Sequence, residues 1–343
     1  MADKKVKVDI FAVAKLARTS TSTVSRSFNH PELVNPAARK RIDRAVRKLG
    51  YIRNRAAQTI HGRRSGTIGL VVPTIDNAIF AEVIQAFSTS VEAQGFSLLV
   101  ASHGYNLERE YASVRKFLEH RVDGIALIGL EHSEETYRLI EGHGTPATTI
   151  WNYDPASRLS CVGVPNHLAG ARAAECLLAH GHREIGLLFP PLTGNDRAKE
   201  RYLGARDVLE AAGVEVRETR VLESVYSLQD AKQTVAEMFA AGDVPSALLC
   251  GNDVLAAGAL YAAQSLGRLV PQDLSIIGIG DFKGSGAMSP GLTTVRLPAR
   301  RIGTLAGAQI AQAITSGACD IERTGCEIEL VLRETVAPLD ASR

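Results

Sequence analysis

Aromatic, amide and charged side chains follow several short apolar segments after residue 66, and these are the residues best suited to chemistry. Together they could bind a sugar-like molecule, because aromatic faces cover C–H groups, Asn and Asp bond hydroxyls, and Arg pairs with a carboxylate or phosphate. Structural roles are the alternative: Asn252 and Asp253 can cap a helix, and Trp151 can belong to a core. The candidate ligand-binding residues are Asp76, Phe80, His103, Tyr105, Trp151, Asn152, Asn166, Arg197, Arg201, Asn252 and Asp281.

Patterns typical of enzymes and metal sites are weak or missing in the sequence. The segment Gly278–Gly284 is superficially similar to the G-x-G-x-x-G pattern of a dinucleotide-binding loop. Its third glycine, however, comes one residue too late, and no early βαβ unit lies next to it. His180 and His182 could bind a metal, although Gly181 between them is better explained as the end of a helix. Nucleophile elbows, Walker loops and H-E-x-x-H motifs are absent from the sequence. We therefore expect no enzyme, no cofactor and no metal.

The elements that must position the candidate residues alternate between strands and helices from Thr67 onward. Such alternation is typical of α/β folds with parallel sheets, and the continuously apolar strands indicate sheets covered on both faces. The strands form two series that separate near residue 165. This predicts two doubly wound lobes, with a ligand cleft beyond the carboxyl ends of their strands. The expected strands are Thr67–Val72, Ser97–Ala101, Asp123–Gly129, Glu184–Phe189, Ser246–Cys250 and Leu274–Gly280.

The net charge of +2 on the 343-residue chain averages two unlike segments. Residues 1–65 hold 16 Lys+Arg and 4 Asp+Glu, a net charge of +12, whereas residues 66–343 hold 23 and 33, a net charge of −10. A basic segment joined to an acidic body is typical of a nucleic-acid-binding head. A disordered basic tail is the alternative, but such a tail would lack periodic apolar residues.

The composition and the first residues of the sequence indicate where in the cell the protein is located. No apolar stretch approaches the roughly 18 residues of a membrane helix, and the basic start MADKKVKVD precedes no apolar core of a secretory signal. Five dispersed cysteines, without a Cys-x-x-Cys pair, argue against a disulfide framework or a zinc site. We expect a cytoplasmic protein with no membrane contact.

The basic segment has the periodicity of a small folded unit. Asp9 and Ser20 are positioned to cap two short helices, and Asn35-Pro36 begins a third helix that Gly50 ends. The first two helices are separated by the tight turn Arg18–Ser20, as in a helix-turn-helix. The segment therefore folds around a small core, whose expected members are Ile10, Val13, Ala14, Leu16, Ala17, Val24, Phe28, Ala38, Ile42, Val46 and Leu49.

The second helix begins with residues suited to contacting DNA. Thr21 and Ser22 are short enough to approach phosphates and base edges, and Arg26 one turn later can bond guanine with two hydrogen bonds. Ser20 and Thr23 have a capping role as the alternative. We expect Thr21, Ser22 and Arg26 to face outward, because Val24 faces the core.

Three segments in this order, Phe11–Ala17, Ser20–Asn29 and Lys48–Tyr51, resemble the lactose-repressor (LacI) family of bacterial transcription regulators. The resemblance continues to the C-terminus and covers nearly the whole chain. It implies a helix-turn-helix domain at 1–50, a hinge helix or linker at 51–66 and a periplasmic-binding-protein-like body at 67–340. Lobe one is expected at about 67–165 and 296–318, and lobe two at about 166–295 and 319–340. Arg18 replaces the usual Gly of the turn, and Ala12 the usual Asp of the first helix.

The resemblance also implies how the hinge acts. In this family it orders on operator DNA and, paired across a homodimer, wedges an apolar residue into the minor groove. Ile60 stands where the family usually has Leu, and Arg53 where it usually has Pro. A flexible basic tether is the alternative, because a helix this short is marginal by itself. DNA contacts are expected from Arg18, Ser20, Thr21, Ser22, Thr23, Arg26, Asn29, Tyr51, Arg55, Ile60 and Arg63.

Further motifs resemble the gluconate-repressor branch, namely Ser102–Tyr105, Phe28–Glu32 and Tyr51–Arg55. The family usually has two successive Asp residues where this chain has Gly280 and Asp281, and the absence of the first Asp also resembles that branch. This implies a sugar-acid effector such as gluconate, with Arg201 matching the family's effector-contacting Arg. A neutral sugar, a nucleoside-type ligand or a corepressor remains open, with an enzyme or a periplasmic sugar receptor as distant alternatives. We expect a homodimeric repressor of a carbohydrate or sugar-acid operon.

Overall fold

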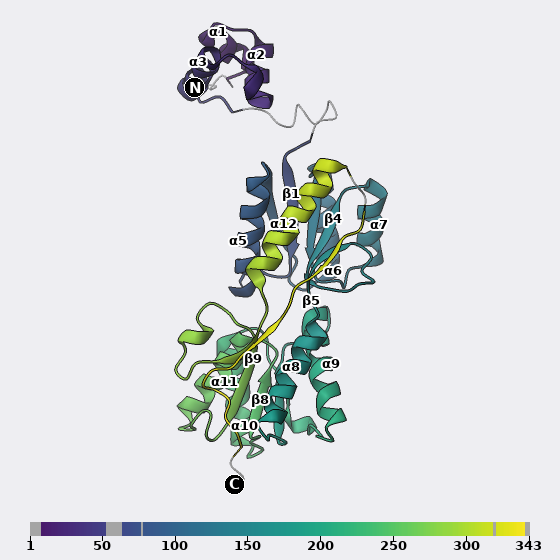
Figure 1. Cartoon of the computed structure of the whole chain (residues 1–343), viewed down its shortest axis with the longest axis vertical. Coiled ribbons are helices and arrows are strands. Elements are labelled where there is room, and N and C mark those ends of the chain that lie inside the picture. Colours follow the sequence, from purple (N-terminus) through teal and green to yellow (C-terminus); the bar gives the residue numbers. More distant parts are fainter. Residues whose placement is uncertain (1–7, 53–63, 77, 318–319, 340–343) are drawn as a thin grey trace, which may run out of the picture. The chain divides into compact units, whose positions relative to one another are not determined.

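The computed structural model describes residues 8–52, 64–76, 78–317 and 320–339. Its contacts divide the chain into two compact units, residues 1–65 and 66–343, which we call the head and the body. Figure 1 shows the helices of the head and the two sheets of the body along the chain.

The head consists of short helices that begin and end where the capping residues predict. They are α1 (Ile10–Ala17), α2 (Thr21–Asn29), the 3-10 turn η1 (Pro31–Leu33) and α3 (Pro36–Leu49). The Asp9 carboxylate accepts the Ala12 N–H at 2.8 Å, and Ser20 Oγ accepts the Thr23 N–H at 3.1 Å. Gly50 ends α3 in the left-handed conformation. The predicted caps Asp9, Ser20 and Asn35 are therefore confirmed.

The head core is small, and two predicted members, Leu16 and Ala38, are not part of it. Leu16 is 42% exposed, because only Ile10, Val13, Ala14 and Ala17 follow the i, i+3, i+4, i+7 spacing that gathers side chains on one helical face. The buried residues are Val13, Ala14, Ala17, Val24, Ile42 and Ala45, with Ile10, Phe28, Val46, Leu49 and Tyr51 packed against them.

The first sheet of the body has the strand order β11-β5-β4-β3-β1-β2 among the described residues, with every pair parallel. With its helices it forms lobe one. Its strands are β1 (Thr67–Val72), β2 (Ser97–Ser102), β3 (Gly124–Ile128), β4 (Ala147–Asn152), β5 (Ser160–Val164) and β11 (Arg323–Gly325). Its helices are α5 (Ala78–Ala93), α6 (Leu107–Glu119), α7 (Glu134–His143) and α12 (Ala299–Ser316).

The second sheet has the order β12-β10-β9-β8-β6-β7, with β12 antiparallel to β10. With its helices it forms lobe two. Its strands are β6 (Ile185–Phe189), β7 (Val221–Glu223), β8 (Ala247–Cys250), β9 (Ser275–Gly280), β10 (Thr293–Arg296) and β12 (Glu329–Val331). Its helices are α8 (Asn166–Ala179), α9 (Asp196–Ala211), α10 (Leu228–Ala240) and α11 (Asp253–Ser265), with the 3-10 turns η2 (Glu218–Arg220) and η3 (Ser285–Ala287). The predicted fold, a helical head followed in the chain by two parallel-sheet lobes, is confirmed.

The chain passes between the lobes after β5, after β10 and after β11 (Figure 1). One predicted boundary is wrong. We expected residues from 319 onward in lobe two, but β11 pairs in parallel with β5, and Arg323 lies opposite Cys161. The strand is three residues long and polar, so its pattern did not indicate that it extends the first sheet.

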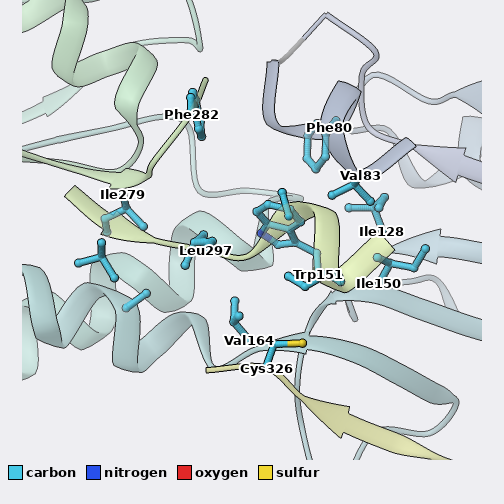
Figure 2. Packing of buried hydrophobic residues seen from close by; sticks show 14 of the residues in the cluster. Phe80, Val83, Ile128, Ile150, Trp151, Val164, Ile279, Phe282, Leu297 and Cys326 are labelled. Carbon is cyan, nitrogen blue, oxygen red and sulfur yellow. The ribbon is translucent and has the colours of Figure 1, made fainter. Parts of the chain in front are cut away.

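Buried side chains from both lobes meet in one cluster (Figure 2). Trp151 of β4 is 1% exposed, and its ring meets that of Phe80 edge to face with centroids 5.9 Å apart. Ile279, Phe282 and Leu297 of the second sheet and its loops belong to the same cluster. The core interpretation of Trp151 is therefore confirmed, and the cluster contains residues of both lobes.

Glycines let α8 and α9 approach closely. A Cβ on Gly170 would stand 1.8 Å from the carbonyl oxygen of Arg201, and one on Gly204 would stand 1.9 Å from that of His167. Each atom is backbone, so neither can move aside without shifting a helix. The close contact fixes α9, which carries Arg197 and Arg201.

We expect Gly204→Ala to lower the free energy of unfolding by about 1–3 kcal/mol, because the added methyl forces the two helices apart. Gly142→Ala is the matched control. Gly142 also lies in a helix, but a Cβ there meets nothing within 4 Å, so this change should stabilise by about 0.5–1 kcal/mol. Urea titration of both variants measures the difference. Equal effects of the two substitutions would contradict the close-packing explanation.

Candidate functional site

A cavity of about 450 Å³ opens between the lobes at the carboxyl ends of their strands. Lobe one contributes Asp76 and Tyr105 to its wall, and lobe two contributes Asn195 and Tyr226. A smaller cavity of about 20 Å³ is lined by Phe80, Trp151, Arg197, Arg201, Tyr226, Asn252 and Phe282. Seven of the predicted ligand-binding residues therefore line one of these two cavities.

Tyr226, which the sequence pattern does not mark as a ligand-binding residue, lines both cavities. Its ring centroid lies 6.4 Å from that of Tyr105, and its hydroxyl accepts the Asn195 side-chain N–H at 3.2 Å. The hydroxyl of Tyr105 is buried and has no hydrogen-bond partner among the described residues. Tyr105 of lobe one and Tyr226 of lobe two thus lie close together in the wall of the larger, outer cavity, and Tyr226 also lines the smaller, inner cavity. The strand before Tyr226 has three residues, too few for its pattern to mark a pocket edge.

Arg201 is the most distinctive group of the inner cavity. Its side chain projects from α9, is 5% exposed, and donates to Asn166 Oδ1 at 2.8 Å and to the Gly251 carbonyl at 3.1 Å. Within the described part of the chain, no carboxylate forms an ion pair with it. Burial lowers the pKa of Arg201 to about 10, so the guanidinium is still charged at neutral pH. It is a buried cation held only by neutral acceptors.

Arg197 lies one helical turn earlier, and its charge is already matched. Its Nη1 donates to the Asp196 carboxylate at 2.8 Å and to the Ile128 carbonyl at 3.4 Å. Its guanidinium also stands 5.9 Å from the ring centroid of Phe80. Arg197 therefore lines the cavity while it contacts lobe one.

A chain of amide hydrogen bonds connects the lobes beside the inner cavity. Asn166, at the start of α8, donates to Asn152 Oδ1 at 3.2 Å, and its own Oδ1 accepts from Arg201. Asn152 in turn donates to the Asp196 carboxylate at 2.9 Å. Asn152 and Asn166 are 5% and 3% exposed. These two predicted residues do not line either cavity, but their hydrogen bonds hold Arg201 and Asp196 in place.

Asn252 and Asp253 have structural roles that the sequence left open. Asn252 Oδ1 accepts the Leu255 N–H at 3.0 Å and so caps α11, although Asn252 also lines the inner cavity. Asp253 does not cap a helix. Its buried carboxylate accepts from the Phe282 N–H and from the Ser285 and Thr294 hydroxyls. Burial raises the pKa of Asp253.

Two predicted ligand-binding residues lie away from the cavities. The Asp281 carboxylate pairs with Arg296 at the end of β10 and with Arg333 after β12, each at 2.6 Å, and its backbone is in the left-handed region (φ 54°). His103 is 4% exposed and lies 3.9 Å from the Glu110 carboxylate. Burial lowers the pKa of His103. Neither of the two is among the residues that line the two cavities.

His180 and His182, the possible metal pair, bond to other groups. His180 Nδ1 lies 2.7 Å from the Cys176 carbonyl, and His182 bridges Ser246 Oγ and the Ala337 carbonyl at 2.9 and 3.1 Å. Gly181 between them has φ +86°, as expected just after a helix. The structural interpretation of this motif is confirmed.

Of the predicted DNA-contacting residues, Ser20, Thr21, Ser22 and Thr23 lie at the start of α2. Ser22 and Arg26 are exposed and Thr21 is half-buried, in line with the outward face expected for them. Thr23 Oγ1 lies 2.8 Å from Ser20 Oγ, so both also serve the cap. Arg18 occupies the left-handed region (φ 52°) that glycine favours. Asn29 donates to Ser25 Oγ at 3.4 Å, and Tyr51 packs on Phe28. Arg55, Ile60 and Arg63 lie outside the described residues.

Comparison with known proteins now identifies the chain. Residues 10–54 match the family described as bacterial regulatory proteins, lacI family, and residues 174–336 match a periplasmic binding protein-like domain. The transcription regulator GntR from Chromobacterium violaceum is 31% identical in sequence, with a TM-score of 0.74 over 78% of this chain and 98% of that one. The chain belongs to the LacI family.

Other LacI-family proteins are similar over almost the full length. The HTH-type transcriptional repressor PurR of Pasteurella multocida is 28% identical over 326 residues, which is 94% of this chain and 97% of that protein. The lac repressor dimer, solved with operator and an anti-inducer, is 25% identical and covers 97% of this chain and all of its own, with a TM-score of 0.83. This LacI-family chain is therefore a DNA-binding transcriptional repressor with an effector-binding domain.

The prediction that the chain is not an enzyme is confirmed by the same relatives, which are transcriptional repressors. Among the residues that the structure describes, none of the helices combines the length and apolar composition that crossing a bilayer requires.

Proposed function

We propose that this LacI-family repressor responds to a sugar acid, with gluconate as the first candidate, and that Arg201 binds its carboxylate. The observation that carries this proposal is a buried guanidinium with only neutral acceptors around it. A buried charge is costly unless an opposite charge compensates it. Arg and carboxylate form short, charge-assisted hydrogen bonds, so an anionic effector would supply the missing partner.

The surrounding groups suit the rest of a sugar acid. The buried Tyr105 hydroxyl without a partner and the amide of Asn195 can bond hydroxyls, and the rings of Phe80 and Tyr226 can cover C–H groups. The sequence motifs that resemble the gluconate-repressor branch agree with this assignment. A neutral sugar is the second candidate, because Arg197, the other arginine in the cleft, already has a carboxylate partner.

Effector binding would require the cleft to widen. The inner cavity of about 20 Å³ has room for little more than one water molecule. A sugar acid must therefore displace Tyr226 or separate the lobes. Either change alters the equilibrium between lobe arrangements, and a ligand that prefers one arrangement shifts the fraction of protein that can bind DNA.

Calorimetric titration of the full chain with gluconate, ribose and galactose tests the effector. We expect heat from gluconate and none from the neutral sugars. Heat from a neutral sugar alone would contradict the proposal. Measuring operator affinity with and without the ligand then distinguishes an inducer, which weakens DNA binding, from a corepressor, which strengthens it.

A homodimer is part of the proposal, and an exposed apolar face of lobe one supports it. Strand β2 is the edge of the first sheet, where Leu99 and Val100 are 40% and 42% exposed. Beside it, a groove of about 390 Å³ is lined by Ile75, Ala81, Ile84, Gln85, Val100 and Ser102. Exposed apolar edges of this kind mark sites of association. A dimer formed through this face would carry two heads, which a pseudo-palindromic operator requires. Such a dimer would act in the cytoplasm.

We expect Arg26→Ala to reduce discrimination between operator and random DNA by about 1–3 kcal/mol, because an exposed Arg on α2 is proposed to contact a guanine. Fluorescence anisotropy at several salt concentrations measures both affinities. Phosphate contacts of the basic head should give a steep negative dependence of affinity on salt, and the variant should retain it. Unchanged discrimination would remove the base-reading role of Arg26, and a flat salt dependence would contradict DNA binding by the head.

A further inference from the structure

The segment between β3 and α7 meets the start of α9 across the cleft. The Asp196 carboxylate accepts the Leu130 N–H at 2.6 Å and the Glu131 N–H at 3.2 Å, and both donors belong to lobe one. Asn152, also in lobe one, donates to the same oxygen at 2.9 Å. We call Asp196 and the segment 128–131 the clasp. It consists of hydrogen bonds between the protein's own groups.

Further hydrogen bonds within each lobe fix the positions of the clasp residues. On the side of lobe two, Asp196 Oδ1 accepts from the backbone and side chain of Arg197, each at 2.8 Å. On the side of lobe one, His132 bonds the Gly129 carbonyl at 3.1 Å, and Tyr137 donates to the Leu130 carbonyl at 2.8 Å. The Asp196 oxygens therefore meet amides whose positions are already fixed.

Gly129 shows how closely the two sides approach. Its φ is +94°, and a Cβ there would stand 2.3 Å from Arg197 Nη1 and 2.9 Å from Asp196 Oδ1. A glycine is thus required both by the backbone conformation and by the close approach. His132 is itself held by the buried Glu110 carboxylate at 2.9 Å, so the segment is braced from within lobe one.

We propose that Asp196 is a positioning residue of the effector response, which fastens lobe two to the 130–131 backbone of lobe one and thereby sets how readily the cleft opens. Hydrogen bonds from amides to a carboxylate are among the stronger ones in proteins. Three of them converge on a single Asp196 oxygen. An effector that separates the lobes to enter the inner cavity must therefore break these hydrogen bonds. Its part in the effector response rests on the proposed function, but the clasp itself does not.

Hydrogen–deuterium exchange of the full chain tests the clasp without any ligand. We expect Asp196→Ala to speed exchange of the Leu130 and Glu131 amides at least tenfold, and Asp196→Asn, which keeps one acceptor oxygen, to have a smaller effect. Asp230→Ala is the matched control, because Asp230 also lies in the first turn of a lobe-two helix and is exposed. It should leave both amides unchanged. Unaltered exchange in Asp196→Ala, or an equal increase throughout both lobes, would overturn the proposal.

Stopped-flow binding of gluconate adds a functional measurement. We expect Asp196→Ala to raise the association rate constant at least threefold over the wild type, since opening no longer breaks the clasp, whereas Asp230→Ala should match the wild type. An unchanged rate in a protein that binds gluconate would overturn the role in the effector response. If the wild type binds no gluconate, the proposed effector is wrong, and the exchange measurement still decides whether the clasp exists.

Discussion

Arg201→Met should weaken gluconate binding at least about 100-fold, because truncating one partner of a buried charge pair commonly costs 2–5 kcal/mol or more. Met keeps most of the length of the Arg side chain but has neither its charge nor its donors. The substitution also removes a buried cation whose acceptors, Asn166 Oδ1 and the Gly251 carbonyl, are neutral. We therefore expect the ligand-free protein to fold and to bind operator as the wild type does. Titration calorimetry and operator anisotropy measure the two effects separately.

Arg172→Met is the control for this substitution. Arg172 lies on α8 in the same lobe, and its side chain is 56% exposed in an ion pair with Glu175. Exposed pairs of this kind contribute about 0–1 kcal/mol, so this variant should bind gluconate normally. Normal gluconate binding by Arg201→Met would mean that the carboxylate does not meet Arg201. The case for an anionic effector would then lose its main support.

The residues that line the cleft could largely be predicted from the sequence, because one rule governs them. Polar side chains that follow apolar strands of a parallel sheet gather at its carboxyl edge, and this rule located Asp76, Phe80 and Arg201 without knowledge of the lobe arrangement. The same rule overpredicts. It selected Asp281, whose backbone is left-handed and whose carboxylate pairs with Arg296 and Arg333. A sequence does not reveal that backbone conformation, since any residue type can adopt it at some cost.

Contacts between the lobes could not be predicted from local patterns. Asp196 has the sequence context of an ordinary first-turn acid, and nothing near it indicates Leu130 as its partner, 66 residues away. Tyr226 follows a strand of three residues, which has no measurable periodicity. In the head, by contrast, the caps and the core follow from spacing within single helices. Leu16 was mispredicted where that spacing was applied too loosely.

Val24→Asp should abolish operator-specific binding while leaving effector binding intact. Val24 is fully buried at the centre of the head core. An ionised carboxylate there has no partner, and the cost of several kcal/mol is large for so small a core. Loss of the folded head should remove the specific part of the affinity, which in such proteins is about 10³–10⁷-fold over non-specific binding. The body has its own cores, so its gluconate affinity should match that of the wild type.

Leu16→Asp separates unfolding of the head from the change in charge. It introduces the same side chain on a neighbouring helix, but at a position that is 42% exposed. The carboxylate remains hydrated there, so the head should stay folded, and operator affinity should fall only by the small electrostatic effect of one added negative charge. Circular dichroism and anisotropy of both variants provide the comparison. An equal loss of operator binding in the two would mean that charge rather than burial decides the result, and the small apolar core would no longer explain why a segment with a net charge of +12 folds.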